Sequence, residues 1–149
     1  MFYFSTLPTR SRIESFLDIQ AYLQNICYAL ENGARLIFQE HRRVDERRNI
    51  RYTNAYTITT LFPDENPVIA LKRELKNLTA ENYIRTVKDL KFPARSEMRE
   101  FGKTYNGADV YVKIRVELLT NTFSHTVLVM SFHFAEREFT TEIFPYKGK

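Results

Sequence analysis

The sequence predicts an α+β domain in which an N-terminal helix and shorter helices pack on an antiparallel sheet. Apolar residues recur at helical spacing near the N-terminus, whereas residues 110–118 alternate strictly between apolar and polar side chains. Asn106 and Gly107 stand between two strand-like segments, as they do in two-residue hairpin turns. We therefore expect the C-terminal third to form a sheet with one apolar face and one basic face that carries tyrosine.

Length and composition indicate one globular domain over residues 1–149. The chain is 44% hydrophobic and 27% charged, which is typical of folded proteins and argues against disorder. The net charge of +4 permits an anionic partner such as nucleic acid without requiring one. No segment has the length and hydropathy of a secretion signal or a membrane span, so we expect a cytoplasmic protein with no membrane partner.

The first helix is predicted over residues 12–32. Ser11 and Glu14 have the spacing of a capping box, and Gly33 provides the stop. The single cysteine, Cys27, excludes an intrachain disulfide and a cysteine zinc cluster, and it is predicted as a small buried side chain. The expected apolar stripe consists of Ile13, Phe16, Leu17, Leu23, Cys27 and Leu30.

A strand over 34–39 is predicted to lead into a turn or strand end over 41–51. That segment holds five arginines and two carboxylates. It is either a solvated loop with internal ion pairs or a segment that contacts phosphate. Residues 52–62 favour β structure because they are rich in Tyr, Thr and Ile, although a short helix after Asn54 is the alternative.

Two further helices are expected before the hairpin. Pro67 suits the first position of one helix, whose inner side would hold Val68, Ala70, Leu71 and Leu75. Thr79 is expected to cap the next helix, which would carry Tyr83, Ile84 and Val87 on its apolar stripe and end near Phe92 and Pro93.

Three strands follow. Segments 100–105 and 109–118 flank the Asn106-Gly107 turn, and a third strand spans 126–134. Successive strand side chains point to opposite faces, so Tyr111, Lys113 and Arg115 should face outward while Val110, Val112 and Ile114 meet the core. In the third strand the alternation groups Leu128, Met130, Phe132 and Phe134 against Val127, Val129, Ser131 and His133.

Familiar catalytic signatures are absent from the sequence. It has no phosphate loop, dinucleotide glycine motif, nucleophile elbow or paired-histidine helix, and its three histidines are dispersed, so we expect no metal and no cofactor. The remaining possibility is a metal-free ribonuclease, which needs a base for the 2′-hydroxyl, cations for the phosphorane and an acid for the leaving oxygen. Tyr111, Lys113, His133 and Arg85 are the candidates, each with the alternative of being an ordinary surface residue.

A succession of motifs resembles the MqsR-like toxins of bacterial toxin–antitoxin pairs. The segments are LTAENY (78–83), EFGK (100–103), NG (106–107), DVYVKI (109–114), SFHFAE (131–136) and FPYK (144–147). The resemblance implies a RelE-like fold over about 34–147, metal-independent cleavage of mRNA, and silencing by a cognate antitoxin protein. The matched catalytic residues are Arg85, Tyr111 and His133. A glutamine of the family falls near Met98, so its polar role would pass to Glu97 or Glu100.

The leading functional hypothesis is therefore an mRNA-cleaving endoribonuclease. The alternative is a non-catalytic accessory protein of a mobile element that binds nucleic acid or protein. The residues expected to contact RNA are Lys103, Lys113, Arg115, Arg42, Arg43, Arg47 and Arg48.

Overall fold

The computed structural model describes residues 8–119 and 124–149, and it confirms the predicted α+β class. Its helices are α1 (Phe16–Glu31), α2 (Asn54–Leu61) and α3 (Pro67–Lys76). Its strands are β1 (Thr9–Arg12), β2 (Arg35–Phe38), β3 (Tyr83–Asp89), β4 (Met98–Tyr105), β5 (Ala108–Leu119) and β6 (Ser124–Phe134). Short 3₁₀ helices occur at Arg43–Arg47 (η2), Ile50–Tyr52 (η3), Ala80–Asn82 (η4) and Thr141–Ile143 (η5).

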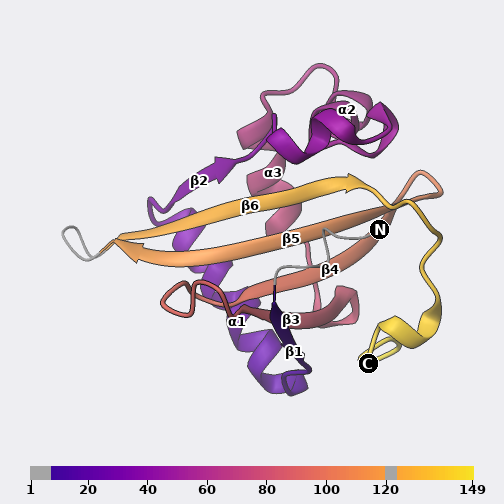
Figure 1. The fold of residues 1–149 in the computed structure, drawn as a ribbon. Coiled ribbons are helices and arrows are strands. Elements are labelled where there is room, and N and C mark those ends of the chain that lie inside the picture. The colour runs from indigo at the N-terminus through magenta and orange to yellow at the C-terminus, as the bar shows by residue number, and fades with distance from the viewer. Residues whose placement is uncertain (1–7, 120–123) are drawn as a thin grey trace.

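The strands form one six-stranded sheet in the order β1-β3-β4-β5-β6-β2. Every neighbouring pair is antiparallel except β2 and β6, which run parallel. Figure 1 shows α1 and α3 behind the sheet and α2 beside its β6–β2 edge. We call the side that packs on α1 and α3 the inner face, and the side toward the viewer in Figure 1 the outer face.

The core lies between the inner face and the helices. α1 contributes Ile19, Leu23, Ile26 and Leu30, which repeat at helical spacing and are buried. Ala70, Leu71 and Leu75 of α3 are buried as predicted. The sheet contributes Tyr83, Phe101, Val110, Val112, Ile114, Val127, Val129, Phe132 and Phe134.

The start of α1 differs from the prediction. Ser15, not Ser11, caps the helix, and its hydroxyl accepts a hydrogen bond from Asp18 N at 3.1 Å. Ser11 instead belongs to β1 and pairs with Val87, because β3 offers the 9–12 segment a hydrogen-bonding edge. Ile13 and Leu17 are consequently exposed, at 56% and 73%.

Two assignments farther along were also wrong in detail. Cys27 is only half-buried, with its Sγ 3.7 Å from the Lys76 carbonyl oxygen. Residues 54–61 form helix α2 rather than a strand, and Thr53 caps it by accepting a hydrogen bond from Tyr56 N. The short helix that had been the alternative is therefore the one that forms.

The segment after Thr79 is a strand, not a helix. A capping box joins Thr79 and Asn82 but supports only one 3₁₀ turn before β3 begins. In β3, a register shift between Tyr83 and Arg85 lets Tyr83 and Thr86 pair with neighbouring inner-face positions of β4. The bulge thus places two residues that are three apart in sequence on the same face of a strand.

A second bulge divides β6. Ser131 pairs with Lys113 while Val129 pairs with Ile114, so Met130 is an extra residue in the ladder. The side-chain alternation changes phase there, and Val127, Val129, Phe132 and Phe134 all reach the core. The predicted grouping of Leu128 and Met130 with Phe132 was therefore wrong, because strict period two cannot register an inserted residue.

Beyond β2, side chains of α2 occupy the edge of β6. The Asn54 amide donates to the Met130 carbonyl at 3.0 Å and accepts from Phe132 N at 2.9 Å. Thr57 Oγ1 accepts from Phe134 N at 2.9 Å. These bonds satisfy backbone groups that a strand edge would otherwise leave open. Within the ranges that the structure describes, no helix is long and apolar enough to cross a membrane.

Candidate functional site: a cationic cluster on the outer face

Polar side chains from four neighbouring strands and one loop meet on the outer face. Tyr111 lies directly opposite His133, and Lys113 lies opposite both Glu100 and Ser131. Arg85 lies opposite Glu100 on the other side. We define the outer-face cluster as Arg42, Arg48, Arg85, Glu100, Tyr111, Lys113, Ser131 and His133.

The pair at the centre is Tyr111 and His133. Their ring centroids are 5.4 Å apart, with the planes inclined at 45°. Tyr111 faces outward as predicted, and His133 meets it because the Met130 bulge sets the register of β6 against β5. Without that extra residue, a strand that places Val129 on the inner face would place His133 on the inner face too.

Two arginines reach the sheet from the loop around η2. Arg42 Nη1 donates to Ser131 Oγ at 3.0 Å, and Arg48 Nη1 lies 3.3 Å from His133 Nε2. Asp45 approaches Arg48 Nε at 3.6 Å, so a carboxylate of the same short helix helps to hold that guanidinium. The sequence left this loop open between internal ion pairs and phosphate contact, and the structure places two of its arginines over β6.

The contacts of His133 define its tautomer. Its Nδ1 lies 3.0 Å from the Phe134 carbonyl oxygen, which only accepts, and Nε2 faces a guanidinium, which only donates. The network therefore assigns the proton to Nδ1 and the lone pair to Nε2. Burial lowers the pKa of His133, and the nearby charges of Arg48 and Arg42 lower it further against the effect of the Phe134 bond. The imidazole is thus held neutral.

Arg85 and Glu100 form an ion pair at the β3 side of the cluster. Arg85 Nε donates to Glu100 Oε1 at 2.7 Å, and this bond raises the pKa of Arg85. The Glu100 side chain is buried, whereas that of Arg85 is half-exposed. Arg85 therefore keeps part of its guanidinium open to solvent while it neutralises a buried carboxylate. It lies on strand β3, not on the helix that the sequence predicted.

Burial shifts the pKa of Tyr111 and of Lys113, the two residues that β5 contributes to the outer-face cluster. It raises the pKa of Tyr111, and the negative charge of Glu100 raises it further, so the phenol stays protonated. Burial lowers the pKa of Lys113, with Arg42 and Arg85 acting in the same direction and Glu100 against it. Lys113 is accordingly a better proton donor than an exposed lysine.

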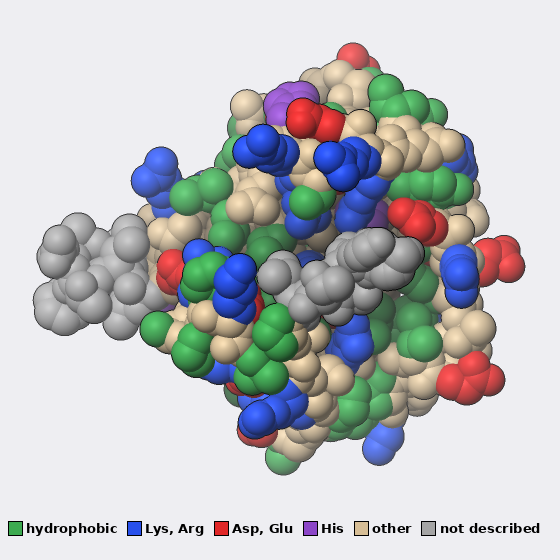
Figure 2. All heavy atoms as spheres, viewed as in Figure 1, with side chains coloured by type: hydrophobic (Ala, Val, Ile, Leu, Met, Phe, Trp, Pro, Cys, Tyr) green, Lys and Arg blue, Asp and Glu red, His purple; other side chains and the backbone are tan. Residues whose placement is uncertain are grey.

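The outer-face cluster has a surplus of positive charge. Four cationic side chains face two carboxylates, if Asp45 is counted with Glu100, which leaves a formal excess of two charges. Figure 2 shows Lys and Arg side chains gathered on this face of the molecule. The cations of this cluster can bind an anion. The neutral imidazole among them can accept a proton from a group next to that anion.

Not every predicted contact residue belongs to the cluster. Lys103 pairs with Val110 and therefore lies on the inner side of β4, with its Nζ over the Tyr105 ring, so it does not share a face with Lys113. Arg43 and Arg47 are exposed and lie away from the contacts that Arg42 and Arg48 make. Arg115 shares the outer face but lies opposite Met98 and Leu128, next to an apolar stretch.

The position near Met98 is also resolved. Met98 is buried beside Arg115 and contributes no polar group. Glu97 pairs with Arg12 at 2.6 Å, far along the β1 side, whereas Glu100 lies in the cluster. Of the two carboxylates considered, Glu100 alone is placed to interact with Lys113. The sequence did not single out Ser131, because its place opposite Lys113 depends on the pairing of β5 with β6.

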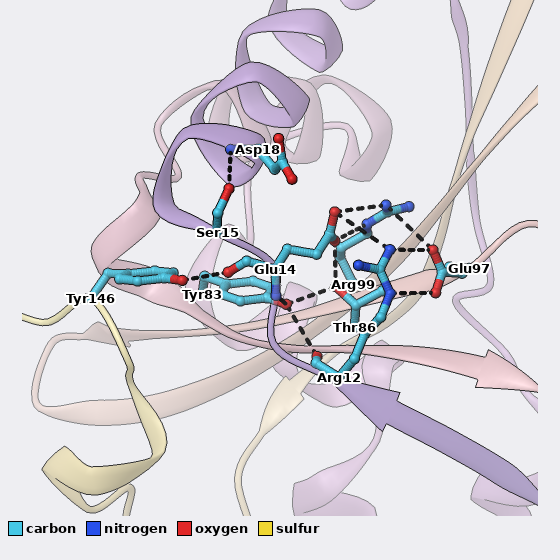
Figure 3. Close-up of polar contacts among 9 residues, drawn as sticks. All are labelled: Arg12, Glu14, Ser15, Asp18, Tyr83, Thr86, Glu97, Arg99 and Tyr146. Atoms are coloured by element: carbon cyan, nitrogen blue, oxygen red, sulfur yellow. Dashed lines mark hydrogen bonds and ion pairs between the residues drawn. The ribbon is translucent and has the colours of Figure 1, made fainter.

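A second polar network, shown in Figure 3, holds elements of the fold together around Glu14. The buried Glu14 carboxylate accepts hydrogen bonds from Arg99 and Thr86, and Tyr146 donates to the Glu14 carbonyl. Tyr83 OH accepts from Glu14 N at 3.1 Å. These bonds tie the β1–α1 junction to β3, β4 and the C-terminal segment.

The chain shows no significant similarity to any protein-family model, curated protein or solved structure.

Proposed function

We propose that the protein is a metal-independent endoribonuclease and that the outer-face cluster is its active site. The observation that carries this proposal is the neutral imidazole of His133, which lies among Arg42, Arg48 and Lys113 and has its lone pair on Nε2. A neutral imidazole is a competent base near physiological pH, and the surrounding cations bind the phosphate whose reaction needs that base.

The cluster supplies a group for each step of RNA transesterification. His133 Nε2 takes the proton of the 2′-hydroxyl, whose oxygen forms a bond to phosphorus. The bond from phosphorus to the 5′-oxygen breaks, and Lys113 protonates that leaving oxygen. The products are a 2′,3′-cyclic phosphate and a 5′-hydroxyl, with no other reactant consumed.

The positions of the acid and the base agree with an in-line reaction. Lys113 is the diagonal neighbour of His133 across β5 and β6. Diagonal neighbours on an antiparallel pair lie about 7–8 Å apart, which leaves space for a phosphate between them. Tyr111, directly opposite His133, donates its hydroxyl hydrogen to a non-bridging oxygen, since its raised pKa keeps it protonated.

The cations stabilise the phosphorane. Arg48 leaves His133 Nε2 for a phosphate oxygen when substrate enters, which frees the lone pair for the 2′-hydroxyl. Arg42 is held above Ser131, and Arg85 offers the part of its guanidinium that Glu100 does not bind. Preorganised charge of this kind is commonly the largest contribution to such catalysis.

The motif order that resembles the MqsR-like toxins supports the same reaction. It extends the proposal to a toxin that cleaves mRNA and is silenced by an antitoxin. An accessory protein that binds nucleic acid without cleaving it would use the same cations, and it differs from the nuclease in making no use of the His133 lone pair.

The test is cleavage of single-stranded RNA by the purified protein in EDTA. We expect 2′,3′-cyclic phosphate products, a loss of about 100-fold or more in rate for His133→Gln, and about tenfold for Tyr111→Phe. Lys103→Met is the matched control for Lys113→Met, because it removes the same charge from the opposite face.

Each outcome separates the alternatives. Intact RNA with wild-type protein overturns the nuclease proposal, whereas full activity in His133→Gln overturns the assignment of the outer-face cluster as its active site. RNA binding that survives in both proteins without any cleavage identifies the accessory function instead.

A further inference from the structure

The loop between β3 and β4, residues 90–97, carries an exposed aromatic ring flanked by cations. Phe92 is 41% exposed. The Arg95 guanidinium lies over its ring, with Cζ 4.1 Å from the ring centroid, and Lys91 Nζ is 5.7 Å from the same centroid. We call Lys91, Phe92 and Arg95 the loop patch. None of its three residues belongs to the outer-face cluster.

Hydrogen bonds hold the backbone of this loop. The Asp89 carboxylate accepts from Lys91 N at 2.9 Å and from Phe92 N at 3.3 Å. Lys88 Nζ donates to the Arg95 carbonyl oxygen at 3.3 Å and to a second carbonyl oxygen of the loop at 2.7 Å. The loop is therefore already ordered, and a ligand that binds the patch does not have to order it.

The loop patch starts from the face that carries the proposed active site. Arg85 and Asp89 lie on the same face of β3, because strand residues an even number apart point in the same direction. At about 3.3 Å per residue, their Cα atoms are about 13 Å apart. Figure 2, which views the outer face, shows Lys and Arg side chains beside hydrophobic ones where the β3–β4 loop lies in Figure 1. A nucleic-acid strand bound at Arg85 therefore reaches the patch within a few nucleotides.

We propose that the loop patch is a second contact site for single-stranded RNA. An unpaired base stacks on Phe92, and the phosphates beside that base bind Lys91 and Arg95. The proposal rests on the proposed ribonuclease function and extends its substrate from the reacting nucleotides to a longer unpaired strand.

The charge of the loop favours an anionic partner. Residues 88–95 include three cations and one carboxylate, and that carboxylate, Asp89, already accepts two backbone hydrogen bonds. The excess positive charge attracts phosphate. Cations alone would also suit an acidic protein, so the aromatic ring decides between the two partners.

The ring between the cations favours RNA with unpaired bases. Proteins that bind single strands without sequence preference combine a positively charged path with aromatic side chains on which bases stack. The Arg95 guanidinium plane adds to this surface, because bases stack on arginine as well as on aromatic rings. Paired bases cannot use Phe92 in this way, since their faces are covered within the duplex.

The first experiment tests the ring with 2′-O-methyl RNA, which resists cleavage. The probes are a single strand of about 12 nucleotides and the duplex of the same sequence. Phe92→Leu keeps apolar surface but removes the ring, so we expect it to bind the single strand about tenfold more weakly and the duplex as wild type does. Phe92→Tyr keeps a ring and should bind the single strand like wild type. The neighbouring Leu90, which is 39% exposed, provides the control for lost apolar surface as Leu90→Ala.

The second experiment tests the cations by the salt dependence of single-strand binding. Each phosphate contact to a single strand contributes about 0.7 to the logarithmic slope, so Lys91→Gln with Arg95→Gln should lower the slope by about 1.4. Arg47→Gln with Lys149→Gln removes the same charges from exposed positions outside the loop and should leave the slope near that of wild type.

The outcomes keep the two proposals apart. Weaker single-strand binding in Phe92→Leu but not in Phe92→Tyr, together with the lower slope, supports the loop site, even if an all-ribose strand stays intact and overturns the nuclease. Unchanged affinity and slope in the loop variants overturn the loop site alone, whether or not the all-ribose strand is cleaved. An equal loss of duplex binding in Phe92→Leu also overturns it, because the ring then does not stack on unpaired bases. Absence of RNA binding by the wild-type protein, as expected of a patch that serves an acidic protein, overturns both.

Discussion

Arg48 Nη1 lies 3.3 Å from Nε2 of His133, so a guanidinium from the loop between β2 and α2 meets an imidazole on β6. A protonated imidazole could not accept this hydrogen bond and would repel the arginine. The contact therefore exists only with the neutral ring, and it couples the position of the loop to the protonation state of the histidine.

The first prediction concerns the pKa of His133, which should lie below the ordinary value of about 6.5. The unfolded protein then binds more protons than the folded one between the two pKa values. The stability contributed by this group is complete above about pH 6.5 and declines as the pH falls toward the folded pKa. Arg48→Gln should raise the pKa by removing a nearby positive charge, whereas Arg47→Gln should leave it unchanged. Titration of the ring Cε1–H resonance by NMR measures both, and equal effects would contradict the Arg48 contact.

The second prediction separates the inward and exposed arginines of the η2 loop. Arg42→Gln with Arg48→Gln should weaken binding to single-stranded RNA and flatten its dependence on salt. Each lost phosphate contact removes about 0.7 from the logarithmic slope, so the double variant should lose about 1.4. Arg43→Gln with Arg47→Gln makes the same change in net charge and should leave the slope near that of wild type. Fluorescence anisotropy over a salt series decides, and the reverse result would move the RNA path to the exposed side of the loop.

The third prediction concerns Glu14. Burial opposes its ionisation, but hydrogen bonds from Arg99 and Thr86 and the charges of Arg99 and Arg12 outweigh it and lower the pKa. Its stabilising effect is therefore present above the unfolded pKa and is lost as the pH falls through the folded pKa. At pH 7, Glu14→Gln should cost on the order of 3 kcal/mol, because the partly buried Arg99 loses its nearest counter-ion and keeps only Glu97, at 3.8 Å. Urea unfolding at pH 7 and pH 3 should show that difference shrinking in acid.

Glu97 provides the control for that experiment. It pairs with Arg12, whose side chain is half-exposed, so Glu97→Gln should cost about 1 kcal/mol or less at pH 7. Equal losses in the two variants would mean that the Figure 3 network does not hold the β1–α1 junction through Glu14.

The fourth prediction concerns Asn54, which is fully buried and bonds to Gln39, Met130 and Phe132. Asn54→Ala should destabilise the protein by about 3 kcal/mol, because it leaves buried backbone groups of the β6 bulge without partners. Hydrogen exchange should report faster exchange of the Phe132 amide in particular. The exposed Asn25 supplies a comparison, and a similar loss in Asn25→Ala would argue against a special role for the β6 edge.

Local patterns predicted the elements that depend on local chemistry. The Asn106-Gly107 turn has positive φ at both residues, at 52° and 82°, and the strands on either side follow from it. Pro67 begins α3, whose cap, Asn66, precedes it. Residues 54–61 and 83–89 were misread because their structure depends on partners distant in sequence. Asn54 and Thr57 serve the edge of β6, and the β3 bulge exists only against β4.

The same division applies to the candidate site. The sequence alone determined that Tyr111 and Lys113 share one face of a strand, because side chains on a strand alternate with a period of two. Only the tertiary structure decided that His133 lies opposite Tyr111 and that Arg42 and Arg48, rather than Arg43 and Arg47, join them. It also moved Lys103 to the inner face. Register and loop docking depend on contacts between distant segments, and a one-residue bulge such as Met130 reverses which side chains meet without leaving a local signal.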